Sequence, residues 1–267
     1  MLECVLNVSE GRDDAALAAL AAAAGADLLD VHTDPHHHRS VFTLVGEAAP
    51  RRLATEAIAR LDLSSHSGAH PRVGIVDVVP FVPLAGSTMA DARRARDELA
   101  RWLADEHQVP VFLYGDERSL PDVRRGAFRT LSPDAGPSTP HPTAGAACVG
   151  YRSALVAYNV WLGDVSIEEA RRIAAAVRSP EVRALGLLLG DHVQVSMNLL
   201  APDVVGPAVA YDLVARHVRT PAHIERAELV GLVPADVLEA IERDRWPALD
   251  LSPERTIEAR LDRGDGA

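Results

Sequence analysis

Apolar runs and amphipathic stretches alternate regularly along the first half of the chain. Short runs rich in valine and leucine predict strands, and stretches with apolar residues every three or four positions predict helices. The predicted order is strand, helix, strand, strand, helix, strand. The strands are expected at residues 2–8, 26–32, 40–45 and 74–82, and the helices at residues 13–24 and from Pro50 onward. A helix at 88–107 and a strand at 109–114 follow. This order is the split β-α-β arrangement of ferredoxin-like domains.

The second half repeats this order of elements. Ser166 and Glu169 form a capping-box pattern that opens its first helix, which ends before Pro180. The other elements are predicted at residues 154–162, 185–189, 193–199, around 204–217, at 224–230, and in a helix opened by Pro234. The sequence therefore predicts an α/β (α+β) protein with two ferredoxin-like β-α-β-β-α-β subdomains, residues 1–146 and 147–267, packed with a ligand cleft between them.

Between the halves lies a proline-rich connection, residues 116–145, with no predicted helix or strand. A connection of this length inside a compact protein is either a linker or a functional loop. Its last part is small, stiff and polar enough to line a ligand cleft. This part comprises Gly136, Pro137, Ser138, Thr139, Pro140, His141, Pro142, Thr143, Ala144 and Gly145.

Composition narrows the classes of function. The formal net charge of −11 argues against a nucleic-acid partner, because such proteins carry a basic face. Lysine is absent, which excludes Schiff-base chemistry on a lysine and Walker-type phosphate binding. No apolar run reaches membrane-spanning length, and the N-terminus lacks a signal-peptide pattern, so we expect no membrane partner and a cytoplasmic location. Cys4 and Cys148 lie in apolar runs and are expected to be buried free thiols.

The histidine loop, residues 64–74, carries the clearest candidate chemistry. It places His66 and His70 four positions apart, and Gly68 and Pro71 make a helix improbable there. Both histidines are therefore expected on a shaped loop that enters the strand beginning near Gly74. A positioned histidine is a natural proton-transfer residue, and the alternative is a loop histidine bonded to backbone.

A second group of histidines follows the strand predicted at residues 26–32. His36, His37 and His38, with His32 and Asp34, suggest a transition-metal site, although side chains of adjacent residues diverge. An exposed hairpin turn and a substrate-facing loop are the alternatives. No Gly-x-Ser-x-Gly elbow and no Gly-x-Gly-x-x-Gly stretch occurs, which argues against a serine hydrolase and against dinucleotide binding.

Several blocks of the chain together resemble the glutamate formimidoyltransferases. The most specific is the histidine loop with its His-Pro-Arg-x-Gly run at residues 70–74, followed by Asp77-Val78 and Pro80-Phe81-Val82-Pro83. The other blocks occur in the order typical of the family, at residues 3–11, 28–31, 39–46, 109–115, 133–137, 145–150, 194–199, 228–234 and 253–258. The resemblance therefore runs nearly from end to end.

The resemblance implies a fold of two α/β subdomains and transfer of a formimidoyl group between N5 of tetrahydrofolate and L-glutamate, a step of histidine degradation. His70 matches the catalytic histidine, expected as general acid and base, and residues 136–145 match the folate-binding segment. Tetrahydrofolate is the co-substrate, L-glutamate or N-formimidoyl-L-glutamate the other substrate, and no metal is expected. A homodimer is compatible with the resemblance, and no cyclodeaminase domain follows.

The resemblance has departures that keep alternatives open. His32 stands where some members carry an acidic residue, and the family's aromatic residues in the folate segment are replaced by Pro140, His141 and Ala144. The alternatives are a diverged folate-binding protein, a transferase with a different acceptor, and a metal-dependent hydrolase that uses His32 and residues 36–38. Arginines that can clamp a carboxylate of glutamate or folate are Arg39, Arg72 and Arg152.

Overall fold

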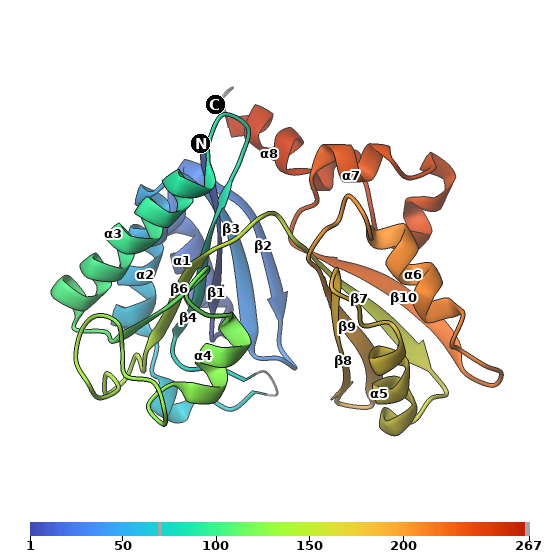
Figure 1. Ribbon diagram of the computed structural model, residues 1–267, viewed down its shortest axis with the longest axis horizontal. Helices are drawn as coiled ribbons and strands as arrows, with labels where there is room; N and C mark the ends of the chain where they lie inside the picture. Colours follow the sequence, from blue (N-terminus) through green and yellow to red (C-terminus); the bar gives the residue numbers. More distant parts are fainter. Residues whose placement is uncertain (69–70, 265–267) are drawn as a thin grey trace. The chain divides into compact units, whose positions relative to one another are not determined.

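The chain forms two compact units, Met1–Ser153 and Ala154–Ala267 (Figure 1). The computed structural model describes residues 1–68 and 71–264. Both units are mixtures of helices and strands, and each has its own sheet and its own apolar core. The sequence predicted this α/β class and two subdomains, and the class is confirmed.

The first unit is built on a six-stranded sheet in the order β2-β3-β1-β4-β6-β5. Strands β1 to β4 are antiparallel neighbours in the 2-3-1-4 order of a ferredoxin-like domain, and β6 runs parallel to both β4 and β5. The elements are β1 (Leu2–Val8), α1 (Asp14–Ala24), β2 (Leu28–Asp34), β3 (Arg39–Val45), α2 (Ala48–Arg60), β4 (Val76–Pro83), α3 (Met89–His107), β5 (Val111–Tyr114), α4 (Leu120–Gly126) and β6 (Ala147–Tyr151).

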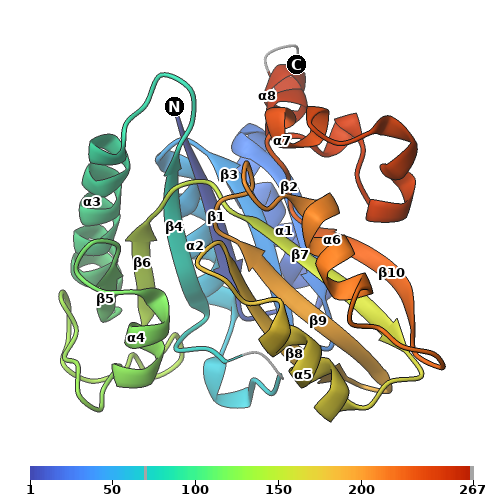
Figure 2. The same cartoon turned by 45° about the vertical axis from the view of Figure 1, so that its right-hand side comes forward.

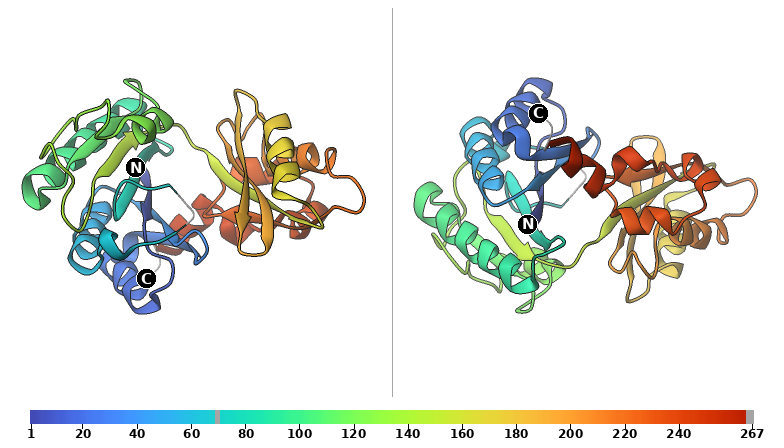
Figure 3. Two further views of the ribbon diagram at one scale, coloured as in Figure 1. Left: turned by 90° about the horizontal axis from the view of Figure 1, so that it is seen from below. Right: turned by 90° about the horizontal axis from the view of Figure 1, so that it is seen from above.

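Helices α1, α2 and α3 cover one face of this sheet (Figure 2). In Figure 3 these blue and green helices lie on one side of the strands in both views. Alternate residues of each strand point to this face, where they pack with the apolar stripes of the helices. The buried side chains there include Leu6, Phe42, Phe81, Leu20, Leu53 and Leu99.

Caps in the sequence fix where the helices of the first unit begin. The Asp13 carboxylate accepts hydrogen bonds from the N–H groups of Ala15 and Ala16. Thr88 and Asp91 form a reciprocal capping box at the start of α3. Pro50 does not open α2, which begins at Ala48; the proline lies in the first turn, where its missing N–H costs no hydrogen bond. No helix in residues 1–68 and 71–264 is both long enough and apolar enough to cross a bilayer.

The opposite face of the first sheet is covered at one end by α4. Val123 of α4 packs there with Phe112, Tyr114 and Cys148. Cys4, on the helix-covered face, and Cys148 are both buried and free, as the sequence predicted. Burial raises the pKa of each thiol, so both stay protonated near neutral pH.

The connection predicted as featureless contains structure, which corrects that prediction. It forms α4, whose Ser119–Asp122 capping box is a recognisable start signal, and short bridges such as Val111 with Ala135. The sequence placed the subdomain boundary between residues 146 and 147. Strand β6 pairs with β4 and β5, so the first compact unit continues to Ser153.

The second unit has a four-stranded antiparallel sheet in the order β10-β7-β9-β8, again the ferredoxin-like order. Helices α5 and α6 cover one face and pack on Tyr158, Val160 and Val195. The Ser166 hydroxyl caps α5 by accepting from the Glu169 N–H. The elements are β7 (Val156–Gly163), α5 (Ile167–Ala176), β8 (Val182–Leu189), β9 (His192–Leu199), α6 (Pro207–Ala215), β10 (His223–Val230), α7 (Ala235–Glu239) and α8 (Ile257–Gly264).

Candidate active site

The turn between β2 and β3 aims one of its histidines at the start of α1. Asp34 organises the turn, because its Oδ1 accepts hydrogen bonds from the N–H groups of His36 (2.7 Å) and His37 (2.9 Å). His38 ends the turn with φ +52°, a left-handed conformation that few residues other than glycine adopt. In this conformation the His38 ring forms side-chain hydrogen bonds, one of them with Glu10.

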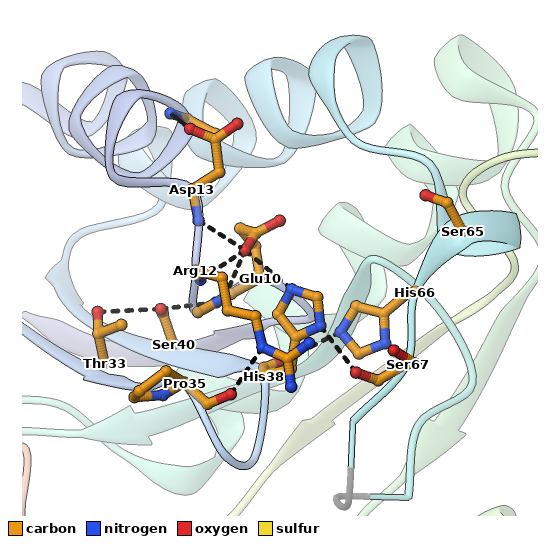
Figure 4. A network of polar contacts seen from close by, with 12 residues as sticks. Glu10, Arg12, Asp13, Thr33, Pro35, His38, Ser40, Ser65, His66 and Ser67 are labelled. Carbon is orange, nitrogen blue, oxygen red and sulfur yellow. Dashed lines mark hydrogen bonds and ion pairs between the residues drawn. The ribbon is translucent and has the colours of Figure 1, made fainter.

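Glu10 is a preorganised carboxylate at the entry to α1 (Figure 4). Its Oε1 accepts hydrogen bonds from the N–H groups of Gly11 (2.7 Å), Arg12 (2.7 Å) and Asp13 (3.0 Å). Burial alone would raise the pKa of Glu10, but these bonds and the one from His38 outweigh burial, so its pKa is lowered. The group is therefore an anion near neutral pH.

His38 connects Glu10 to the histidine loop. Its Nε2 lies 3.0 Å from Glu10 Oε1, and its Nδ1 lies 3.0 Å from the carbonyl oxygen of Ser67. The His66 ring stacks on the His38 ring with centroids 4.0 Å apart and planes 14° apart. His66 Nε2 donates to the backbone carbonyl of His38 at 2.9 Å. The turn and the histidine loop are thus joined by three contacts around two imidazoles (Figure 4).

Arginines hold both described flanks of the histidine loop. Arg72 donates to the carbonyl oxygens of Gly68 (3.1 Å) and His66 (2.8 Å), and Arg124 donates to that of Pro71. His70, the predicted catalytic residue, lies outside the described residues.

A buried carboxylate joins two cations on the sheet face opposite α1, α2 and α3. Asp77 is fully buried, and its Oδ2 lies 2.7 Å from Arg39 Nη1 and 2.7 Å from Arg124 Nη2. Its Oδ1 accepts from the N–H of Val73 at 2.7 Å, and Arg39 also donates twice to the Asn7 side chain. Burial alone would raise the pKa of Asp77, but the two arginines and the Val73 bond lower it overall. Two guanidiniums therefore share one carboxylate.

The end of the predicted folate segment runs beside the exit of the histidine loop. Ile75 N–H donates to the carbonyl of Ala144 (2.9 Å), and Ala146 N–H donates to that of Val73 (3.0 Å). Gly74 and Gly145 form a bridge at the crossing, where a Cβ on Gly74 would collide with the backbone of Ala146. The structure therefore brings these two sequence-predicted segments together within the first unit.

The His141 side chain forms hydrogen bonds within the predicted folate segment itself. Its Nδ1 accepts hydrogen bonds from the N–H groups of Ala144 (3.0 Å) and Thr143 (3.3 Å). Its backbone pairs with Gly145, which has φ +72°. The replacement of an aromatic residue by His141 thus coincides with a side chain that closes a turn.

The second unit has a polar cluster on the sheet face opposite α5 and α6. Glu228 Oε2 accepts from Trp161 Nε1 (2.9 Å), Asn159 Nδ2 (3.0 Å) and Gln194 Nε2 (3.3 Å). Arg226 lies over the Trp161 ring, 4.2 Å from its centroid. Gln194 and Glu228 belong to the two blocks of the second half that carried the family resemblance.

Comparison with known proteins identifies the family. Residues 1–152 match the formiminotransferase domain, N-terminal subdomain. A glutamate formimidoyltransferase of Streptococcus pyogenes is 34% identical over 89% of this chain and 90% of its own length. That of Thermoplasma acidophilum is 34% identical over 89% of each chain. The chain belongs to the formiminotransferase family.

Some members of the formiminotransferase family are longer. The formimidoyltransferase-cyclodeaminase of Sus scrofa is 35% identical over 89% of this chain, which spans 51% of that relative. The family resemblance read from the sequence is thereby confirmed.

In this formiminotransferase the three suggested clamp arginines have different surroundings. Arg39 belongs to the Asp77 cluster, whereas Arg72 binds carbonyls of its own loop and Arg152 donates to the Ser153 carbonyl at 3.0 Å. Sequence reasoning did not identify Glu10 or Arg124. Glu10 accepts from N–H groups of the loop before α1, whereas the helix itself is capped by Asp13, so no capping pattern pointed to Glu10. Arg124 carried no signal either, because its helix was not predicted.

The histidines of the turn, the alternative metal site, have other surroundings within residues 1–68 and 71–264. No group of three or more histidine, cysteine, aspartate or glutamate side chains converges as metal ligands among the residues the structure describes. Asp34 is engaged with the N–H groups of the turn, and His38 faces Glu10 and Ser67.

Proposed function

We propose that the protein is a glutamate formimidoyltransferase, which moves a formimidoyl group between N5 of tetrahydrofolate and L-glutamate. The observation that carries the proposal is the match of 89% of the chain to relatives of that name in two organisms. The local geometry adds support, because the histidine loop and the end of the folate segment lie side by side through the bonds between residues 73–75 and 144–146.

The reaction needs proton transfer at a nitrogen. In the direction toward folate, N5 attacks the amidine carbon of N-formimidoyl-L-glutamate and forms a C–N bond. The C–N bond to the glutamate nitrogen then breaks, and that nitrogen leaves as an amine after gaining a proton. We assign His70 as the base that takes the proton from N5 and the acid that returns one to the amine. Such assistance is typically worth about a hundred- to ten-thousand-fold in rate.

The Asp77 cluster supports recognition of a carboxylate. Arg39 and Arg124 both lie beside Asp77, and guanidiniums pair with carboxylates through two parallel hydrogen bonds. Glutamate and the folate tail both carry carboxylates. Residues 136–145 are proposed to bind the folate, with Pro140, His141 and Ala144 in place of stacking aromatics.

The proposal is tested by incubating the protein with N-formimidoyl-L-glutamate and tetrahydrofolate and following release of glutamate. We expect turnover, and we expect His70→Ala to lower kcat by about a hundredfold or more while folate still binds. His192→Ala, an exposed histidine of the second unit, is the matched control and should keep full activity. Unchanged turnover in His70→Ala would reject the assignment of the acid–base residue.

The same assay separates the alternatives. Binding of 5-formyltetrahydrofolate without transfer to any amino acid would favour a diverged folate-binding protein. Transfer to another amino acid would favour a different acceptor, and activity that disappears on chelation would favour the hydrolase. A cytoplasmic location and a homodimer stay predictions, and light scattering on the purified protein measures the second.

A further inference from the structure

The hydrogen bonds of His38 define its protonation state. One ring nitrogen faces the carbonyl oxygen of Ser67 and the other faces a carboxylate oxygen of Glu10, each at 3.0 Å. A carbonyl oxygen and a carboxylate oxygen can only accept. Both contacts are hydrogen bonds only when both ring nitrogens carry a hydrogen, which makes the ring an imidazolium cation.

The stacked partner of His38 has the opposite character. His66 donates from Nε2 to the His38 carbonyl, and its buried Nδ1 has no hydrogen-bond partner within the described part of the chain. Burial lowers the pKa of His66, and the charges of Arg72 and His38 lower it further. A neutral ring lies on a charged ring, because two cations at a centroid distance of 4.0 Å would repel.

The charged and titratable groups around His38 come from three segments. Before α1 they are Glu10 and Arg12, in the turn Asp34 and His37, and on the histidine loop His66 and Arg72. Within the described part of the chain, Glu10 is the anion that meets the His38 ring directly, while Arg12 donates to the Pro35 carbonyl and Asp34 organises the turn. Glu10 is thus the counter-charge for His38.

We propose that His38 is a positioning residue, whose doubly protonated ring fastens the histidine loop to the start of α1. The tie holds Ser67, three positions before His70, through the His38 Nδ1–H that donates to the Ser67 carbonyl. A neutral ring would present a lone pair either to the Ser67 carbonyl or to Glu10, so one attraction would become a repulsion. The effect on turnover rests on the proposed function, whereas the protonation state and the tie do not.

Nitrogen-15 NMR of the histidines in the wild-type protein measures the protonation state of His38 directly. One imidazole should show both nitrogens protonated at pH 7.5, and that signal should vanish in His38→Asn. Asparagine is chosen because it tolerates the left-handed backbone at this position. In Glu10→Gln the signal of the His38 nitrogen that faces residue 10 should shift, because its carboxylate partner is gone. A neutral tautomer for His38 at pH 7.5 would overturn the proposal.

Kinetics test the positioning role. His38→Asn and Glu10→Gln should lower kcat by about ten- to a hundredfold, as expected for misplacement of a reacting group by about 1 Å, with a smaller change in the KM for tetrahydrofolate. His192→Asn, which removes another histidine beside a carboxylate, is the matched control.

The two proposals fail in different ways. If the wild type shows the protonated His38 but no transfer to folate, the proposed function fails and the tie stands. If the wild type is active and the kcat of folded His38→Asn equals that of the wild type, the positioning role is rejected. Thermal unfolding of each variant confirms that it is folded.

Discussion

Asp77 shows how one buried side chain can hold distant parts of the chain. It joins Arg39 at the start of β3, Arg124 in α4 and the N–H of Val73 at the exit of the histidine loop. A buried anion with these partners is favourable only while all of them are present, since charges out of water depend on each other. The cluster is therefore a structural support as well as a candidate carboxylate site.

Asp77→Asn should be strongly destabilising. The change keeps the shape but leaves Arg39 and Arg124 side by side without their shared anion, and breaking a buried pair costs about 3–5 kcal/mol. Urea unfolding at pH 7 measures the loss. Glu98→Gln, which removes an exposed partner of Arg94 in α3, is the control and should change the free energy of unfolding far less. Equal effects would show that the Asp77 cluster contributes no special stability.

His66 should make the first unit less stable as the pH falls below about 6.5. The pKa of His66 is lowered in the folded protein, so the unfolded chain binds its proton first, and protonation then favours unfolding. Stability from this residue is complete above its unfolded pKa and decreases below it. Unfolding free energies at pH 7.5 and pH 5.5 measure the change, and His66→Gln should show a smaller difference between the two. A larger difference in the variant would contradict the lowered pKa.

At the residue scale, the sequence indicated which side chains are candidates for proton transfer, but not which residues they contact. The pattern of the histidine loop was enough to nominate His66 and His70. The bonds of His38 to Glu10 and Ser67 span 28 and 29 positions, and that of Arg124 to Asp77 spans 47. Such pairs depend on the tertiary arrangement of strands and turns, which a local sequence pattern does not predict.

At the scale of elements, helices and strands were predicted correctly where the periodicity of apolar residues extends over a long stretch. The β-α-β-β-α-β order of each half was predicted because long amphipathic helices and apolar strands have distinct periods. Helix α4 and strand β6 were missed. Helix α4 is only seven residues long, in a segment dominated by proline. Strand β6 is only five residues long, too short for its pattern to show a clear period.

The crossing of the histidine loop and the folate segment should tolerate no side chain at Gly74. A Cβ there would overlap the backbone of Ala144 and Ala146, which cannot move without breaking the bonds that join the two segments. We expect Gly74→Ala to cost about 4 kcal/mol or more and to abolish transfer. Gly86→Ala is the control, since Gly86 has φ +82° but open space around it, and should cost only about 1–2 kcal/mol of backbone strain. Thermal unfolding of both variants measures the comparison.

At the scale of the whole molecule, each unit has the ingredients of an independent domain. Each has its own sheet and its own buried cluster. A fragment of residues 1–153 should therefore unfold in one cooperative transition when followed by circular dichroism. A fragment of residues 1–146 should not, because it lacks β6, which pairs with both β4 and β5. Equal midpoints for the two fragments would show that β6 is dispensable.

Strand β6 also has a consequence for biosynthesis. The last strand of the first unit to be translated is an interior strand of its sheet, inserted between two that have already been made. While the ribosome is still adding residues 147–151, the edges of β4 and β5 are open and can pair with other chains. Nascent chains that pause there are expected to depend most on chaperones, and synonymous codons that slow translation just before residue 147 should lower the soluble yield.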